Sequence, residues 1–251
     1  MTLLIDFLCR FGWGLSLAMV LTPAAIVPAG FFRVNLLVVL GLATLAGLLE
    51  KTAFTESLIV GAAIAAWLGS VAWLADRQRA GMALCVACTV LLGVATVATV
   101  SLQPGTGVSA AWFSAASMKL LSGAVVGLTV HAMLLGHWYL NAPGMRVDAL
   151  RRMIDLAMVA WGLQLAVSLS VAIVRWSVAS VVVADSATVA LGSLRWLAGL
   201  IGLPILLWLS RKTLDIPNTQ SATGILYVAC LAAIVGELTA QLLYAAVPSS
   251  P

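Results

Sequence analysis

The sequence predicts an all-α integral membrane protein, a polytopic bundle of about eight transmembrane helices with no soluble domain. Hydrophobic residues make up 63% of its 251 residues and charged residues only 9%, whereas charged residues are about 25% of a typical soluble domain. The mean hydropathy is +1.11. Because one transmembrane helix needs roughly 20 apolar residues, eight helices leave only short connectors in a chain of this length.

The apolar runs are continuous instead of alternating and are about twice as long as a barrel strand, so helices are favoured over a β-barrel. Pro23 and Pro28 end the first run, since proline lacks a backbone donor and blocks helical continuation. The charged pair at residues 50–51 closes the second run. Polar residues 76–79 close the third, and the turn sequence 103–107 closes the fourth.

The later runs follow the same rule. The fifth is the longest, ~42 Å at 1.5 Å per residue, so it must tilt or protrude before residues 141–144 end it. Asp148 is placed to cap the sixth helix, and Pro204 predicts a kink in the seventh. The predicted spans are residues 3–23, 31–49, 56–75, 81–101, 112–140, 149–174, 188–210 and 222–246.

The first run is expected to be a transmembrane span and not a signal peptide, because Asp6 precedes Arg10 in it. No internal repeat stands out, although eight spans could arise from four plus four. We therefore treat residues 1–251 as one transmembrane domain.

Basic residues predict the orientation. The connectors after the odd-numbered spans carry eight of them, and those after the even-numbered spans carry only Lys51 and Arg175. By the positive-inside rule, the odd connectors lie in the cytoplasm and both termini lie outside. We expect a multi-pass protein of the bacterial inner membrane, with the lipid bilayer and other membrane or peripheral subunits as partners. No basic stripe with interleaved aromatics is present, which argues against nucleic acid.

A stripe of residues follows the fifth span at intervals of four. Lys119, Gly123, Gly127 and His131 share one face of this helix. Gly123 and Gly127 form a GxxxG pair, which predicts a close helix crossing. The lysine and histidine at its ends then face a neighbouring helix or a cavity, where they could move protons or bind a polar ligand.

Proton transfer is one candidate activity of this stripe. His131 and Asp155 lie at similar depths on the antiparallel fifth and sixth helices, so we expect them to meet. A carboxylate at a histidine fixes its tautomer, as a proton relay requires. Two alternatives stay open: a polar pair that only joins the helices, and a pairing of Asp155 with Arg151 one turn earlier.

The predicted cytoplasmic end of the fifth helix holds the densest group of aromatic and hydrogen-bonding side chains. Aromatic rings suit stacking on a quinone, and a histidine or tyrosine suits hydrogen bonding to its carbonyl. The alternative is an aromatic belt with ordinary positive-inside arginines. The candidate quinone-binding residues are His137, Trp138, Tyr139, Arg146, Arg151 and Arg152.

Charged residues also fall within the predicted outer half. Lys119, Arg195 and Glu237 lie at comparable depths on the fifth, seventh and eighth spans. They predict either an ion pair that locks the bundle or an anion or proton site that opens outward. Asp6 and Arg10 are one turn apart and are expected to satisfy each other near the surface.

Other chemistry finds little support in the sequence. Cys85 and Cys88 have redox spacing but lie among apolar residues without a charge to activate a thiol. His131 and His137 are six residues apart and cannot hold one haem or metal from a single helix, so haem is not expected from this chain alone. No nucleotide-binding or metal motif is present.

Three functions follow as hypotheses. The first is an integral subunit of a respiratory or other electron-transfer complex that handles quinone near the cytoplasmic side; in layout alone, the chain is similar to quinol-handling membrane anchor subunits. If catalysis occurs, it would occur within such an oxidoreductase complex, because no catalytic motif is self-contained. The second is a small proton-coupled transporter or channel, and the third is a non-catalytic scaffold or assembly subunit.

Overall fold

A computed structural model of the chain confirms the all-α fold. It describes every residue except 1, 101–108, 143–145, 177–185, 217 and 247–251. Within the described residues, eight helical spans are long and apolar enough to cross a membrane. The helices are α1 (Thr2–Leu21), α2 (Ala29–Leu49), α3 (Ala53–Leu74), α4 (Gln78–Ala98), α5 (Ala110–Asn141), α6 (Asp148–Trp176), α7 (Ser186–Leu194), η1 (Arg195–Gly202), α8 (Leu203–Thr213) and α9 (Thr219–Ala246).

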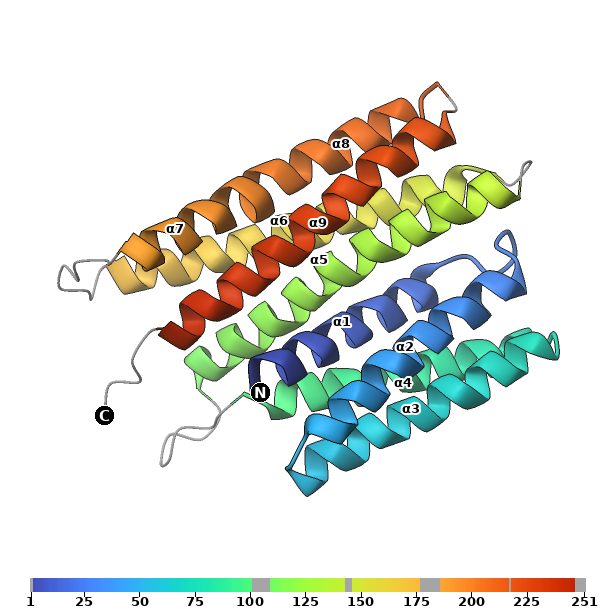
Figure 1. The fold of residues 1–251 in the computed structure, drawn as a ribbon, viewed down its shortest axis with the longest axis horizontal. Coiled ribbons are helices and arrows are strands. Elements are labelled where there is room, and N and C mark those ends of the chain that lie inside the picture. The colour runs from blue at the N-terminus through green and yellow to red at the C-terminus, as the bar shows by residue number, and fades with distance from the viewer. Residues whose placement is uncertain (1, 101–108, 143–145, 177–185, 217, 247–251) are drawn as a thin grey trace.

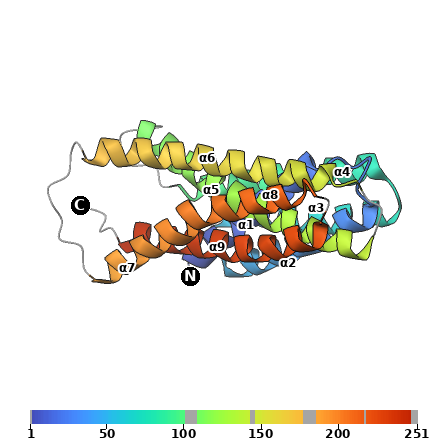
Figure 2. The same cartoon turned by 90° about the horizontal axis from the view of Figure 1, so that it is seen from above.

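The spans pack in two groups of four (Figure 1). One group contains α1 to α4, and the other contains α5, α6, α9 and the single span made by α7, η1 and α8. The groups meet chiefly where α1 packs against α5. Consecutive helices α6 and α7 separate toward the end where the chain terminates (Figure 2).

Burial differs strongly between individual spans of the two groups. In the first, Phe32 stacks on Trp73 with ring centroids 4.3 Å apart, and both side chains are fully buried. In the second, no residue of α7 or η1 (186–202) is buried. This span therefore presents most of its apolar surface outward, as a lipid-facing helix does.

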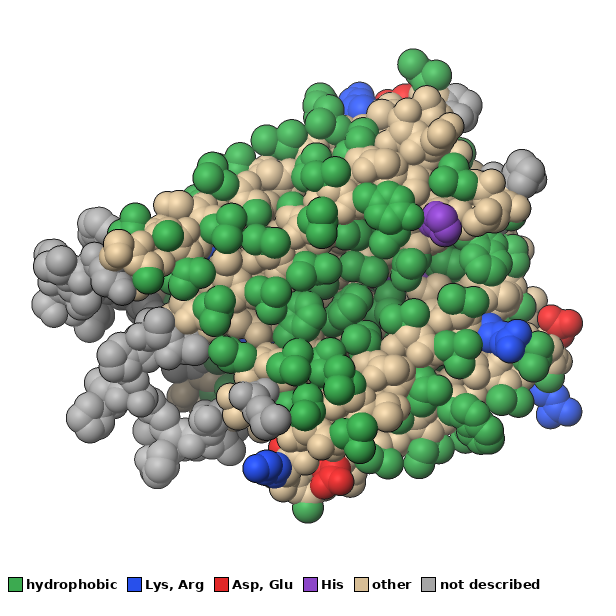
Figure 3. Space-filling model, in the orientation of Figure 1, with side chains coloured by type: hydrophobic (Ala, Val, Ile, Leu, Met, Phe, Trp, Pro, Cys, Tyr) green, Lys and Arg blue, Asp and Glu red, His purple; other side chains and the backbone are tan. Residues whose placement is uncertain are grey.

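Charged side chains on the visible face gather near the ends of the bundle, and apolar ones cover the length between (Figure 3). The end at which α1 begins and α9 ends is called the termini end below. The opposite end is called the basic end after the residues near it, which are Arg33, Arg77, Arg79, Arg146, Arg151, Arg152, Arg211 and Lys212.

The structure adds detail at Pro204 and corrects one expectation at Asp148. A π-helical segment, η1, lies directly before Pro204, which stands in the first turn of α8. Proline lacks the N–H of a regular helix, so the hydrogen-bond pattern changes before it. Asp148 is the first residue of α6 and not the cap before it, and its carboxylate pairs with Arg146 at 2.8 Å.

Candidate functional site: an ion network within the bundle

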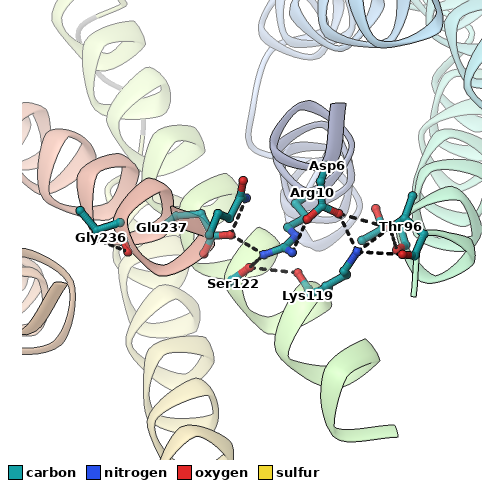
Figure 4. A network of polar contacts seen from close by, with 10 residues as sticks. Asp6, Arg10, Thr96, Lys119, Ser122, Gly236 and Glu237 are labelled. Atoms are coloured by element: carbon teal, nitrogen blue, oxygen red, sulfur yellow. Dashed lines mark hydrogen bonds and ion pairs between the residues drawn. The ribbon is translucent and has the colours of Figure 1, made fainter. Parts of the chain in front are cut away.

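An arginine near the middle of α1 links two acidic residues (Figure 4). Arg10 Nη1 donates to Glu237 Oε1 on α9 at 2.6 Å, and Arg10 Nη2 pairs with Asp6 one turn earlier on α1. The side chains of all three residues are at least four-fifths buried. Asp6 and Arg10 do pair, as expected, but they do so inside the bundle and as part of a larger network.

A lysine on α5 extends the network to α4. Lys119 Nζ lies 2.9 Å from Asp6 Oδ1 and 2.6 Å from Thr99 Oγ1, the residue that follows α4. The Arg10 guanidinium also donates to Ser122 Oγ on α5 at 3.3 Å. Side chains of α1, α5 and α9, together with Thr99, thus form one connected set of ion pairs and hydrogen bonds. These contacts lower the cost of placing charged side chains inside a membrane.

Glycines let α1 and α5 come close enough to form this network. A Cβ added to Gly123 would lie 2.5 Å from the Arg10 carbonyl oxygen, and one added to Gly127 would overlap the Gly14 backbone. Any larger residue at these positions must separate the two helices. The GxxxG pair on α5 therefore faces α1 at a backbone-to-backbone contact, which sets Ser122 beside Arg10 and Lys119 beside Asp6.

A cavity of about 300 Å³ adjoins the network between α1, α5, α6, η1 and α9. Its charged lining consists of three basic and two acidic side chains. Arg195 is the third basic residue, and it makes no hydrogen bond or ion pair with any residue that the structure describes. The charged residues of the lining are Asp6, Arg10, Lys119, Arg195 and Glu237.

This arrangement corrects the expected ion cluster of Lys119, Arg195 and Glu237. The three do line one cavity, but Glu237 pairs with Arg10 and Lys119 pairs with Asp6. Helix α1 packs against α5, and its Asp6 and Arg10 side chains supply the partners at this level. Arg195, left over from the expected cluster, is half-buried and has no ion pair with a residue in the described ranges.

A second cavity, of about 630 Å³, lies on the other side of Asp6 and Lys119, toward the termini end. Its rim includes Glu50 and Thr52 in the connection between α2 and α3. The backbone N–H groups of Thr52 and Lys51 lower the pKa of Glu50, so this carboxylate stays ionised at the rim. Asp6 and Lys119 line both cavities.

The expected meeting of His131 and Asp155 is wrong. His131 is fully buried, its Nε2 lies 2.7 Å from Thr22 Oγ1 on α1, and its Nδ1 has no partner in the described part of the chain. Asp155 is half-buried and accepts from Arg211 Nε on α8 at 2.9 Å. Similar depth was not enough, because the two side chains leave their helices toward different neighbours. The alternative pairing of Asp155 with Arg151 is also not formed.

The aromatic group at the basic end does not converge either. Exposed His137 Nδ1 lies 3.1 Å from Tyr227 Oη on α9, and Trp138 packs edge-on against Phe31 of α2. Tyr139 is buried, and its hydroxyl donates to the Arg146 carbonyl. Successive helical residues point about 100° apart, so these three side chains reach three different neighbours instead of one ligand.

The arginines of this group have separate local roles. Arg146 pairs with Asp148 at the surface, and Arg151 donates to the Leu214 carbonyl at 2.5 Å, where it caps the end of α8. Arg152 is exposed. Positive charge at a helix C-terminus is favourable, so Arg151 has a structural role.

The described residues contain neither a disulfide nor a group of side chains placed to bind a metal ion. All four cysteines are buried and unpaired as disulfides, Cys85 and Cys88 among them. No group of three or more His, Cys, Asp or Glu side chains is placed to hold a metal ion in the described ranges. The cysteines pack as small apolar residues.

Neutral polar residues are the members of the site that sequence reasoning missed. Thr99, Ser122, Gln164 and Gln241 contact the charges or line the cavity. Hydroxyl and amide side chains are common at helix contacts within membranes, so single ones carry little signal. One usable signal was spacing, since Gln241 follows Glu237 by one turn on the same helix face.

Comparison with known proteins identifies no relative: no family model matches this chain, and neither a curated protein nor a solved structure matches it significantly. The chain is a polytopic helical membrane protein. Any finer function has to be argued from the geometry of its sites.

Proposed function

We propose that this protein is a membrane transporter that binds a small organic monoanion in the cavity beside the ion network. The observation that carries the proposal is Arg195, a cation inside a transmembrane span with no described partner, facing a cavity that already holds two other cations. A charge at this depth costs several kcal/mol unless it is compensated. A monoanion would supply that compensation.

The lining also favours an anion with an apolar body. Leu3, Ala115, Met118 and Ala240 form apolar wall, and Gln164 offers an amide. A volume of about 300 Å³ is at the lower end of the range for small-molecule sites. A carboxylate on a small ring or short chain matches both the charge and the space.

Transport is favoured over static binding by the irregular helix at the cavity. The π-helical segment η1 begins at Arg195, and Gly199 on it touches the Gly236 backbone on α9. Broken or unwound helices at a central site are typical of transporters. The positive-inside prediction places this cavity in the outer half of the membrane, so it would receive the anion from outside.

The test uses the purified chain in detergent and in proteoliposomes, with benzoate as the probe and acetate and chloride as comparators. We expect saturable benzoate binding and uptake. Arg195→Gln should weaken binding roughly 10- to 100-fold, because a hydrogen bond to a charged group contributes about 1.5–3 kcal/mol. Arg33→Gln, at an exposed arginine of the basic end, is the matched control and should change nothing. Absence of binding for all three anions, or equal binding by both variants, contradicts the proposal.

A quinone-handling role in an electron-transfer complex is the second candidate. The contact between His137 and Tyr227 favours it, because both side chains are exposed on the side of the bundle, where a lipid-soluble carbonyl compound could accept a hydrogen bond. The test is quinone analysis of the purified protein and quinone-linked turnover of any complex that copurifies with it. A sample free of quinone, with turnover unchanged by His137→Ala, would exclude this role.

A further inference from the structure

We propose that Glu237 binds a proton when the anion binds, so that the site takes up one proton with each anion. This inference rests on the proposed function and adds the coupling ion and the residue that holds it. The proton is transferred from a hydronium ion or a protonated buffer molecule, whose O–H or N–H bond breaks as an O–H bond forms at Glu237 Oε2.

The two carboxylates of the network differ in how fully they are engaged. Both oxygens of Asp6 are occupied: Oδ2 pairs with Arg10, and Oδ1 accepts from Lys119 Nζ at 2.9 Å and from Thr99 Oγ1 at 3.2 Å. Both oxygens of Asp6 therefore already have cationic partners.

Glu237 is engaged through one oxygen only. Its Oε1 accepts from Arg10 Nη1 at 2.6 Å and from Gln241 Nε2 at 2.8 Å. Its Oε2 makes no hydrogen bond with a residue in the described ranges, although the side chain is almost fully buried and lines the cavity. Oε2 is thus a free acceptor position next to the space that the anion would fill.

The charged groups around Glu237 come from three elements. Arg10 and Asp6 face it from α1, Lys119 from α5, and Arg195 from η1. The cavity-lining residue of α6 is Gln164, and the neighbour on α9 itself is Gln241, both neutral. The empty site therefore carries three positive and two negative charges.

An arriving anion changes this balance. The ligand carboxylate and Glu237 are like charges that compete for Arg10, and like charges in one site favour protonation of one of them. Glu237 has the free oxygen, so it is the group that gains the proton. A neutral Glu237 releases Arg10 toward the ligand, so the ligand carboxylate is held by Arg195 and Arg10 together.

Isothermal titration of benzoate into the detergent-solubilised protein, in two buffers with different ionisation enthalpies, counts protons taken up on binding. We expect about one proton per benzoate, and an affinity that falls as much as tenfold per pH unit across the alkaline side of the titration. Glu237→Gln should bind benzoate with no proton uptake and with an affinity independent of pH. Glu237→Asp should restore proton uptake, and Glu56→Gln, at an exposed carboxylate of α3, should behave as the parent.

The outcomes separate this inference from the proposed function. Benzoate binding that depends on Arg195 but takes up no proton overturns the inference and leaves the function standing. Proton uptake that persists in Glu237→Gln also overturns it, because another group then holds the proton. If Glu237→Gln does not fold, the proton count of the parent and of Glu237→Asp still decides. Failure of benzoate, acetate and chloride to bind overturns both proposals.

Discussion

The ion network at the termini end and the aromatic group at the basic end form in opposite ways. The network draws Asp6, Arg10, Lys119 and Glu237 from distant parts of the chain into contact. The aromatic group consists of adjacent residues, 137–139, which the helix turns toward three different neighbours. Residues that are adjacent in a helix rarely share a site, whereas residues one turn apart, on helices that touch, regularly do.

Among the substitutions that test this difference between the two ends, one that separates α1 from α5 should reduce folded yield and stability the most. Gly127→Leu places a side chain where the Gly14 backbone lies, so α1 must move and the network loses its central arginine. We expect little or no folded protein, because overpacking against backbone cannot relax by rotamer changes. Folded yield and thermal stability in detergent measure this. Gly162→Leu is the control, since a Cβ there meets nothing within 4 Å. Equal behaviour of the two variants would show that the α1–α5 contact is not close.

Removal of one charge from the ion network should cause the second-largest loss of stability. Arg10→Gln leaves Glu237 and Asp6 without their shared cation in the bundle interior. Breaking a buried pair costs about 3–5 kcal/mol, whereas Arg146→Gln at the basic end removes an exposed pair and should cost about 0–1 kcal/mol. Reversible unfolding in mixed micelles measures both. Similar losses for the two variants would mean that the network is as solvated as the surface.

The buried histidine provides an intermediate test. Thr22→Val removes the hydroxyl 2.7 Å from His131 Nε2 and leaves this buried ring without a described partner. An unsatisfied buried group costs about 1–3 kcal/mol. Thr44→Val, at an exposed position of α2, is the control in the same unfolding measurement. A loss no greater than that of the control would show that His131 is satisfied by another group.

The smallest effect is expected at the exposed pair of the basic end. Tyr227→Phe removes the hydroxyl that contacts His137 but leaves the ring in place. Exposed substitutions of this kind usually change stability by less than about 0.5 kcal/mol. Unfolding in mixed micelles should place this variant within error of the parent. A loss above about 1 kcal/mol would mean that the pair at the basic end contributes as much as a buried contact, and the contrast between the two ends would weaken.

The fold was predictable because hydropathy is a local property. Runs of apolar residues and the breaks at Pro23, residues 103–107 and residues 141–144 are written along the chain, and each predicted span corresponds to a helical span of the structure. The contact face of α5 was predictable for the same reason, because the spacing of Gly123 and Gly127 in the sequence is enough to predict a close helix crossing. In both cases, the bilayer limits the chain to hydrogen-bonded helices, which leaves few alternatives.

The identity of partners was not predictable, because it depends on how each helix is rotated and on which helix lies beside it. Depth along the membrane can be counted from the sequence, and it led to the wrong pair of His131 with Asp155. Because of how the helices are rotated, His131 instead hydrogen-bonds to Thr22 on α1, and Asp155 pairs with Arg211 on α8. The packing of α1 on α5 brings Arg10 to Glu237 of α9, and Arg195 lines the cavity without an ion pair to a described residue. The sequence by itself determined the spans and the small-residue face. Only the tertiary structure decided which charges meet and which one has no ion pair among the described residues, because electrostatic pairing follows distances of a few ångströms between helices.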